Sequence, residues 1–264
     1  MKVGQRVLLA PSQSCRQCAQ CVGGLDNYCR QYTVLGYFND GGNREFMAVP
    51  EVYAIPIPES LSFEEAAAVP LVFLTAWHML VGRAGLRAGE EVLVLAAASG
   101  VGSAAVQIGK MLGCRVIATA GGEEKMARAR ELGADEVIDH YRQNITDEVK
   151  RLTGKRGVDV VLEHVGEATW QHSVMSLAHH GRLVTCGATT GPQVGVDLRY
   201  VYARQLSLLG SFMGTLGELH EVLGFVFRGR LRAVVDRAYP LAEIRAAHLR
   251  LENKEQFGKV VLTV

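Results

Sequence analysis

The fold is decided by the stretch from Glu91 to Asp139, which reads EVLVLAAASGVGSAAVQIGKMLGCRVIATAGGEEKMARARELGADEVID. It opens with a short apolar, β-branched run at Val92–Leu95, which predicts a buried strand of a parallel sheet. A turn of small residues follows, and then helix formers from Ala104 to Leu112 place apolar residues on one face. Gly113 marks the end of this helix, because glycine adopts the left-handed conformation that ends helices without a steric cost.

The pattern continues with a second strand at Arg115–Ala120 and a second helix at Glu123–Leu132. Strand, glycine turn, helix and strand make up the βαβ unit that binds dinucleotides. In such a unit, glycines let the backbone approach a pyrophosphate, to which the helix N-terminus offers free N–H groups. A glycine turn between this strand and this helix is far more specific than glycine spacing alone. The pyrophosphate-binding candidates are Ser99, Gly100, Val101 and Gly102.

Length and composition restrict the class of protein. With 264 residues the chain can bury a large core in one or two domains. The formal net charge is +1 with both signs interspersed, which argues against a nucleic-acid partner. The longest apolar stretch, Ala66–Trp77, contains Pro70 and is too short to span a membrane. The N-terminus lacks the apolar region of a signal peptide, so we expect a cytoplasmic protein. We expect its partner to be a small-molecule substrate.

Outside the central stretch, two further regions have their own patterns. Residues 1–60 alternate short strand-like segments, including Arg44–Pro50, with glycine and proline turns, which predicts an antiparallel, barrel-like module. Ser62 and Glu65 have the spacing of a helix capping box. In the middle of the chain strands and helices alternate, with a further strand at Val158–Glu163. The predicted fold class is therefore α/β with a doubly wound parallel sheet.

Four cysteines in a loop rich in Gln, Gly and Asn follow the pattern C-x2-C-x2-C-x7-C. Four thiolates this close can surround one Zn²⁺ tetrahedrally and leave no position open, which describes a structural zinc site. Disulfides are disfavoured without a secretion signal, and the bacterial iron–sulfur pattern ends in C-x3-C-P instead. Cys186 lies at the end of a further predicted strand, Arg182–Gly187, where packing is a simpler role for it than a place near the nicotinamide of a bound dinucleotide. The predicted zinc ligands are Cys15, Cys18, Cys21 and Cys29.

The cysteine loop and the dinucleotide unit together resemble those of the medium-chain dehydrogenases/reductases, over essentially the whole chain. The small-residue turn is closer to that of the quinone oxidoreductases, whereas the cysteine loop is more typical of the zinc alcohol dehydrogenases. This mixture resembles the subgroup called zinc-binding alcohol dehydrogenase-like. Further motifs that carry the resemblance are Lys2–Val7, Gly41-Gly42 with Glu45-Phe46, Glu65–Ala68, Thr75–His78, Gly133–Asp135 and Gly258–Leu262.

The resemblance implies a division into three segments. Residues 1–80 would form part of a GroES-like catalytic domain with the zinc lobe, residues 81–217 a Rossmann dinucleotide-binding domain, and residues 218–264 a return to the catalytic domain. The chain begins part-way through the family's first domain, so we expect a fragment or a late start codon. The third catalytic-zinc ligand of the family should fall close to Leu71, in a run without Cys, Asp, Glu or His. Apolar side chains cannot hold Zn²⁺, so we expect no catalytic zinc.

Without that Lewis acid, the resemblance implies hydride transfer from a reduced nicotinamide to a quinone, an enone or an activated carbonyl. Thr75 and His164 are the catalytic candidates, although a hydrogen-bonded structural role is the simpler one for His164. Two alternatives stay open: a fragment of a zinc-dependent alcohol dehydrogenase, and a cofactor-binding protein with little turnover. The residues that the resemblance places at the nicotinamide are Thr75, Gly187, Gly210, Ser211 and Phe212.

The cofactor signal is divided. NAD-binding units place an acidic residue about 20 residues after the glycine turn, where this chain has Gly121 and Gly122. Two glutamates follow at 123–124, but the helix dipole also favours carboxylates in a first turn. In the quinone oxidoreductases a lysine and a tyrosine hold the 2′-phosphate, and Lys125 and Tyr141 occupy the matching places. A cation beside a roomy glycine turn suits a phosphate, so we expect NADPH, with NADH as the alternative.

The last strand of the predicted sheet, Gln205–Leu209, is long and apolar for an edge. Exposed edges of this kind pair with another chain. In the related enzymes the equivalent edge joins two cofactor domains into one continuous sheet. We therefore expect a homodimer, or a homotetramer built from such dimers.

Overall fold

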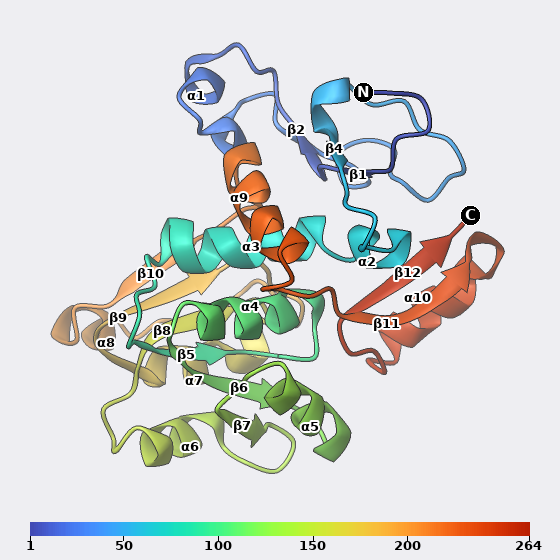
Figure 1. Ribbon diagram of the computed structural model, residues 1–264. Helices are drawn as coiled ribbons and strands as arrows, with labels where there is room; N and C mark the ends of the chain where they lie inside the picture. The colour runs from blue at the N-terminus through green and yellow to red at the C-terminus, as the bar shows by residue number, and fades with distance from the viewer. The chain divides into compact units, whose positions relative to one another are not determined.

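The computed structural model describes all residues from Met1 to Val264 and divides into two compact units (Figure 1). The first unit joins both ends of the chain, Met1–Leu74 and Met213–Val264, and the second is the continuous middle, Thr75–Phe212. None of the helices combines the length and the apolar character that crossing a lipid bilayer requires.

The second unit is built on a six-stranded parallel sheet, which confirms the predicted fold class. The strand order is β10-β9-β8-β5-β6-β7, and every neighbouring pair is parallel. The chain starts in the middle of the sheet, runs to one edge and then returns to build the other, which is the doubly wound topology. The strands are β5 (Glu91–Val94), β6 (Arg115–Ala120), β7 (Glu136–Asp139), β8 (Val158–Glu163), β9 (Leu177–Thr185) and β10 (Ser207–Gly210).

Helices cover both faces of this sheet (Figure 1). Side chains alternate between the faces of a strand, so Leu93 and Ile117 pack in one apolar cluster with residues of α6 and α7. Val92 and Val116 point the other way, toward Gly109 of α4. All four strand side chains are fully buried. The helix α3 (Pro70–Trp77) begins in the first unit and ends in the second. The other helices of the second unit are a π-helix (His78–Arg83), α4 (Gly100–Met111), α5 (Glu123–Glu131), α6 (Ile145–Leu152), α7 (Glu167–Met175) and α8 (Leu198–Ala203).

The first unit has three separate two-stranded sheets. The pairs β1–β4 and β2–β3 are antiparallel, whereas β11–β12 is parallel. Its strands are β1 (Val7–Leu9), β2 (Ser12–Gln13), β3 (Thr33–Val34), β4 (Ala54–Pro56), β11 (Val235–Pro240) and β12 (Lys259–Thr263). Its helices are α1 (Ala19–Val22), α2 (Phe63–Ala67), α9 (Leu216–Phe227) and α10 (Ile244–Glu252), with 3-10 turns at Asp26–Tyr28, Glu51–Tyr53 and Leu241–Glu243.

Two local predictions for the first unit have opposite outcomes. The capping box is confirmed, since Glu65 N–H donates to Ser62 Oγ (3.1 Å) and Ser62 N–H donates to Glu65 Oε2 (3.0 Å). The strand expected at Arg44–Pro50 is wrong, because this segment has no neighbouring strand with which to pair. Phe46, within it, is 87% exposed.

Candidate dinucleotide site and thiolate cluster

The turn between β5 and α4 brings two stretches of its own backbone close together. A Cβ atom on Gly102 would lie 2.2 Å from the carbonyl oxygen of Ala96, so only glycine fits there. Ala96 itself has a positive φ of 49°. Thr119 of β6 holds the turn in place, because its Oγ1 accepts from Ala96 N–H (2.9 Å) and its carbonyl accepts from Ala97 N–H (2.8 Å).

The N-terminus of α4 is suited to an anionic ligand. Ser99 caps the helix, and its Oγ accepts from Gly102 N–H (2.9 Å). The N–H groups of Gly100 and Val101 have no acceptor within the chain. With the positive end of the helix dipole, these donors fit the pyrophosphate of a dinucleotide. The four residues predicted for this role therefore lie together at one helix end.

His164 follows β8 and reaches across to the same turn. Its Nε2 lies 3.1 Å from the carbonyl oxygen of Leu95 and 3.3 Å from Ser99 Oγ. Desolvation lowers the pKa of His164, which favours a neutral ring that donates from Nε2 to the Leu95 carbonyl. The imidazole thereby links β8 to the cap of α4. Its role as a proton donor stays a prediction.

A buried carboxylate that the sequence reasoning missed organises this loop. Glu163, the last residue of β8, is fully buried and accepts from Val165 N–H (2.6 Å) and Gly166 N–H (3.1 Å). The hydroxyls of Thr169 and Ser173 in α7 also donate to it. The carboxylate thus lies at the positive end of α7, where a negative charge is favoured. The signal in the sequence was a glutamate that directly ends an apolar run of a buried strand.

The ends of β9 and β10 bring together most of the residues predicted for the nicotinamide. Ser211 N–H donates to the carbonyl of Thr185 (2.9 Å), and Thr185 Oγ1 donates to the carbonyl of Gly187 (3.2 Å). Gly187 also lies against His164, since a Cβ on it would be 3.2 Å from the His164 carbonyl oxygen. Arg83 Nε donates to the carbonyl of Gly210 (2.8 Å) and fixes this backbone.

Three other side chains predicted for this region, those of Cys186, Phe212 and Thr75, differ in their exposure to solvent. Desolvation, together with the negative charge of Glu163, raises the pKa of Cys186 to about 12, so its thiol stays protonated. Phe212 is 49% exposed. Thr75 is buried in α3, and its contact with the nicotinamide stays a prediction.

The other end of the candidate site lies beyond β6 and β7. A Cβ on Gly121 would come within 2.3 Å of the Tyr141 ring, so this ring packs directly on the glycine backbone. Asp139 is buried, and its Oδ1 accepts from Tyr141 N–H (3.0 Å) and, at 3.5 Å, from Gly122 N–H. The carboxylate therefore joins the two loops. Lys125 lies in the first turn of α5, directly after them.

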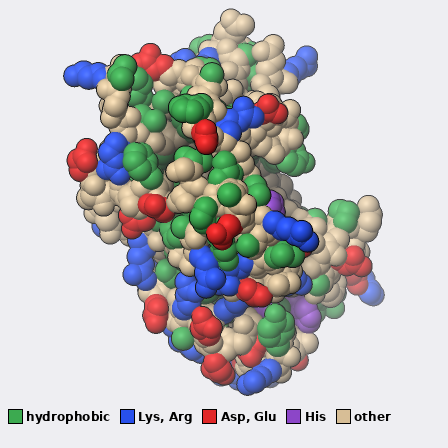
Figure 2. Space-filling view, turned by 90° about the vertical axis from the view of Figure 1, so that its right-hand side faces the viewer, with side chains coloured by type: hydrophobic (Ala, Val, Ile, Leu, Met, Phe, Trp, Pro, Cys, Tyr) green, Lys and Arg blue, Asp and Glu red, His purple; other side chains and the backbone are tan.

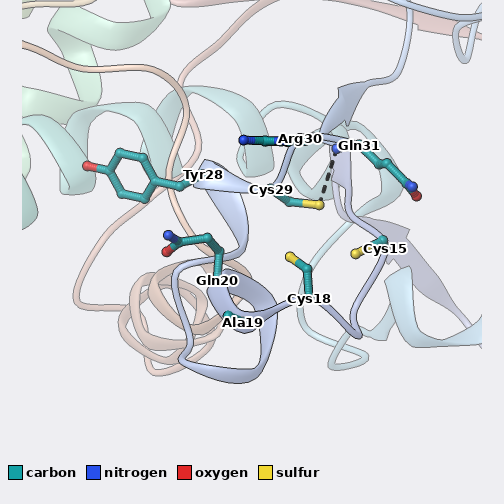
Figure 3. Close-up of a pocket in the computed structure, with 8 residues that line it drawn as sticks. All are labelled: Cys15, Cys18, Ala19, Gln20, Tyr28, Cys29, Arg30 and Gln31. Carbon is teal, nitrogen blue, oxygen red and sulfur yellow. Dashed lines mark hydrogen bonds between the residues drawn. The ribbon is translucent and has the colours of Figure 1, made fainter.

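The four cysteines of the predicted zinc site come together in the first unit. Their sulfur atoms all lie within 4.8 Å of one another. The Sγ of Cys21 is 3.9 Å from that of Cys15 and 3.6 Å from that of Cys18. Zn–S bonds of about 2.3 Å in a tetrahedron separate the sulfurs by about 3.8 Å, so the spacing fits Zn²⁺. Figure 3 shows the sulfurs of Cys15, Cys18 and Cys29 directed toward a shared space.

The electrostatics of this thiolate cluster also fit a cation. Backbone N–H groups of Gln17 and Cys18 lower the pKa of Cys15 to about 6. For Cys18, the N–H of Cys21 works in the same direction, but desolvation and the neighbouring thiols together raise the pKa to about 11. Gln31 N–H donates to Cys29 Sγ (3.3 Å). Four adjacent thiols cannot all ionise without a compensating positive charge, which a bound Zn²⁺ supplies.

Two family descriptions match the chain. The alcohol dehydrogenase GroES-like domain matches residues 1–59, and the zinc-binding dehydrogenase family matches residues 100–228. A quinone oxidoreductase of Pseudomonas aeruginosa is 36% identical over 232 residues, which are 84% of this chain and 71% of that protein. An alcohol dehydrogenase of Geobacillus stearothermophilus is 30% identical over 265 residues, which cover 100% of this chain and 77% of that protein.

A solved structure named NAD-dependent alcohol dehydrogenase is similar with a TM-score of 0.95 and 44% identity, and the match covers 99% of this chain and 76% of that one. The chain therefore belongs to the medium-chain dehydrogenase/reductase superfamily, as the resemblance implied. These relatives also make it an NAD(P)-dependent oxidoreductase.

Proposed function

We propose that this protein transfers hydride from NADPH to a quinone, an enone or an activated carbonyl without a catalytic zinc. The observation that supports this proposal is the side-chain chemistry of α3. By the resemblance, the family's third zinc ligand falls close to Leu71, and the run from Ala66 to Trp77 contains no Cys, Asp, Glu or His. The only group of three or more suitable side chains is the cysteine cluster, whose four thiolates leave no coordination position for a substrate.

The residues of the second unit have separate tasks in this proposal. A bound nicotinamide supplies the hydride, and the chain supplies alignment and exclusion of water. The α4 N-terminus holds the pyrophosphate through Gly100 and Val101 N–H groups. Neutral His164 keeps the Ser99 cap in position, and Glu163 keeps His164 in position. The backbone of Gly187 and of Gly210-Ser211 then forms the surface against which the nicotinamide packs.

The preference for NADPH rests on the loops after β6 and β7. Gly122 leaves room for a phosphate, since nothing lies within 4 Å of the position that a Cβ on it would take. The Tyr141 ring packs on the neighbouring Gly121, and Lys125 supplies a cation. Two glutamates favour NADH. In one of them, Glu123, Oε1 lies 3.9 Å from Arg142 Nη1, so the guanidinium partly compensates the carboxylate charge. The relative named NAD-dependent alcohol dehydrogenase favours the opposite preference, so the cofactor must be measured.

A homodimer completes the proposal. β10 is an edge strand of the six-stranded sheet, and Ser207, Leu208 and Gly210 on it are exposed. One side of β10 pairs with β9, and the backbone N–H and C=O groups on its other side are available to pair with β10 of another copy. A monodisperse monomer in light scattering at micromolar concentration would contradict this part.

One set of assays tests the function. We expect NADPH-dependent reduction of 9,10-phenanthrenequinone, at an initial rate that added Zn²⁺ does not raise. Zn²⁺-dependent oxidation of primary alcohols with NAD⁺ would overturn the proposal in favour of a zinc alcohol dehydrogenase. Cofactor binding without turnover of either substrate would instead support a binding protein.

A further inference from the structure

We infer that His140 is a further specificity-determining residue, which in its protonated form adds a second cation for the 2′-phosphate of NADPH. The inference rests on the proposed use of NADPH. It implies that pH regulates the binding of NADPH at that same site. His140 belongs neither to the glycine turn nor to the predicted phosphate ligands, Lys125 and Tyr141.

The strand register places His140 beside the glycine turn that admits the phosphate. Ala120 and Asp139 are paired neighbours at the ends of β6 and β7. The residues that follow them, Gly121 and His140, therefore leave the sheet side by side, on strands about 4.8 Å apart. Both loops are tied to each other by the Asp139 carboxylate, through Gly122 N–H and Tyr141 N–H.

Ring contacts place the imidazole next to the predicted phosphate ligand. The His140 and Tyr141 rings meet edge to face, with centroids 4.6 Å apart and an interplanar angle of 68°. The Tyr141 ring in turn packs on Gly121. His140 is exposed, so its ring can turn toward a ligand without leaving the core.

Charged groups on three sides control the ionisation of this imidazole. Desolvation lowers the pKa of His140 below its usual 6.5, and the positive charge of Lys125 in α5 works in the same direction. Asp139, on its own strand, partly opposes both. Arg142 lies near both Glu123 (Nη1 to Oε1, 3.9 Å) and Asp139 (Nε to Oδ2, 3.8 Å). The free protein therefore has a neutral His140 at pH 7, so the imidazole adds no positive charge beside Gly121 before the cofactor binds.

A phosphate dianion between Lys125 and His140 reverses this balance. It screens the lysine from the imidazole and attracts a proton to His140, which raises the pKa of the histidine in the complex. Binding of NADPH should therefore take up a proton near neutral pH, whereas binding of NADH should not. The preference for NADPH should accordingly increase as the pH falls from 8 to 6.

The test must separate this effect from titration of the phosphate itself, whose second pKa is about 6. We would measure the Kd values of NADPH and NADH at pH 6 and pH 8 for the native protein and for His140→Gln. The phosphate titrates equally in both, so their difference belongs to the histidine. At pH 6 we expect the ratio of the NADH Kd to the NADPH Kd to be about threefold to fivefold larger in the native protein than in His140→Gln. At pH 8 we expect the two proteins to have the same ratio. Equal pH dependence in the two proteins would overturn the inference.

Two additional measurements complete the design. His179→Gln changes an exposed histidine of β9, outside the loops after β6 and β7, and should behave as the native protein does. Calorimetry of NADPH binding in buffers of different ionisation enthalpy should show more proton uptake by the native protein than by His140→Gln. Equal uptake by the two proteins contradicts the inference. The proposed function fails separately, if NADH binds as tightly as NADPH at pH 8 and Lys125→Ala changes neither affinity.

Discussion

The two units of this chain differ in how they bury apolar side chains. Of the twelve largest fully buried side chains, nine belong to the unit Thr75–Phe212 and three to the unit formed by the two ends of the chain. Thirteen of the nineteen exposed large apolar side chains belong to the latter. On the face shown in Figure 2, hydrophobic side chains lie exposed among acidic and basic ones. The middle unit is therefore stabilised by its own core, and the terminal unit depends more on specific links.

Several such links connect the cysteine lobe to the segment before α9. The Asp26 carboxylate accepts from Leu216 N–H (3.0 Å), and Tyr32 OH donates to the Gly214 carbonyl (3.3 Å). Desolvation raises the pKa of Tyr32 to about 12, which keeps its phenol protonated as a donor. Thr215 then caps α9 in a second capping box. A Zn²⁺ ion bound by the four cysteines would stabilise this lobe further, because metal-binding energy contributes to folding energy.

The largest expected effect is therefore loss of the metal. Cys29→Ser should reduce the zinc content from about one equivalent to none and lower the stability of the terminal unit by about 5 kcal/mol or more, because metal-binding energy is folding energy. Elemental analysis would measure the zinc content, and calorimetry with limited proteolysis would measure the stability of the terminal unit. The middle unit should keep its transition. Cys114→Ala is the control, since Cys114 is buried outside the cluster. Retention of a full zinc equivalent in Cys29→Ser would contradict the site.

The next effect compares one glycine in each unit. Gly102→Ala puts a Cβ 2.2 Å from the Ala96 carbonyl, so it should displace the turn, weaken dinucleotide binding at least about 100-fold and destabilise the middle unit by about 3 kcal/mol. Gly217→Ala, also in the first turn of a helix, meets nothing closer than 3.7 Å. It should stabilise the terminal unit by up to about 1 kcal/mol. Cofactor titration and thermal unfolding would show both, and unchanged cofactor binding in Gly102→Ala would contradict the assigned turn.

A third comparison concerns two carboxylates that bind backbone N–H groups. Glu163→Gln keeps one oxygen for the Val165 and Gly166 N–H groups, which both donate to Oε1. It places the amide NH2 where Oε2 accepts from the Thr169 and Ser173 hydroxyls, in a fully buried position, which should cost about 2–4 kcal/mol. Glu65→Gln, exposed in its capping box, should cost only about 0.5 kcal/mol. Chemical denaturation would measure the difference. Similar losses for both variants would mean that Glu163 is not held as the structure shows.

Sequence reasoning succeeded where one local signal fixes the geometry. The doubly wound sheet follows from alternating buried strands and helices, and the cysteine spacing brings four sulfurs within 4.8 Å. It failed at Arg44–Pro50, because a strand needs a partner and nothing in the local pattern states whether one exists. It also began β9 at Arg182, whereas the strand starts at Leu177.

The tertiary links of the site were beyond the sequence for a similar reason. Glu163 and Asp139 both end buried strands, where carboxylates are rare unless paired. Their partners lie in loops whose course depends on the assembled sheet, so the pairing could not be derived from spacing. The contact of His164 with Leu95 and Ser99 joins residues more than 60 positions apart. Such contacts appear only once the strand order is known.

The smallest expected effect compares one aspartate in each unit through pH. Burial raises the pKa of Asp26 although it accepts from Leu216 N–H, so its ionised form costs stability above that pKa. Asp26→Asn should therefore stabilise the terminal unit by up to about 1 kcal/mol at pH 7, and the gain should disappear as the pH falls below the ordinary Asp value.

Asp159 should show the opposite sign. Desolvation opposes its ionisation, but Arg156 and the Glu91 N–H together lower its pKa, so its stabilising effect is present at neutral pH. Asp159→Asn should cost about 1 kcal/mol at pH 7, a value reduced by the partial exposure of the pair, and the cost should vanish as the pH falls through the lowered pKa. Unfolding curves of both variants between pH 3 and pH 8 would test this. Parallel pH profiles for Asp26→Asn and Asp159→Asn would mean that both units hold their partly buried carboxylate in the same way. The difference between the units in apolar burial would then not extend to their charged groups.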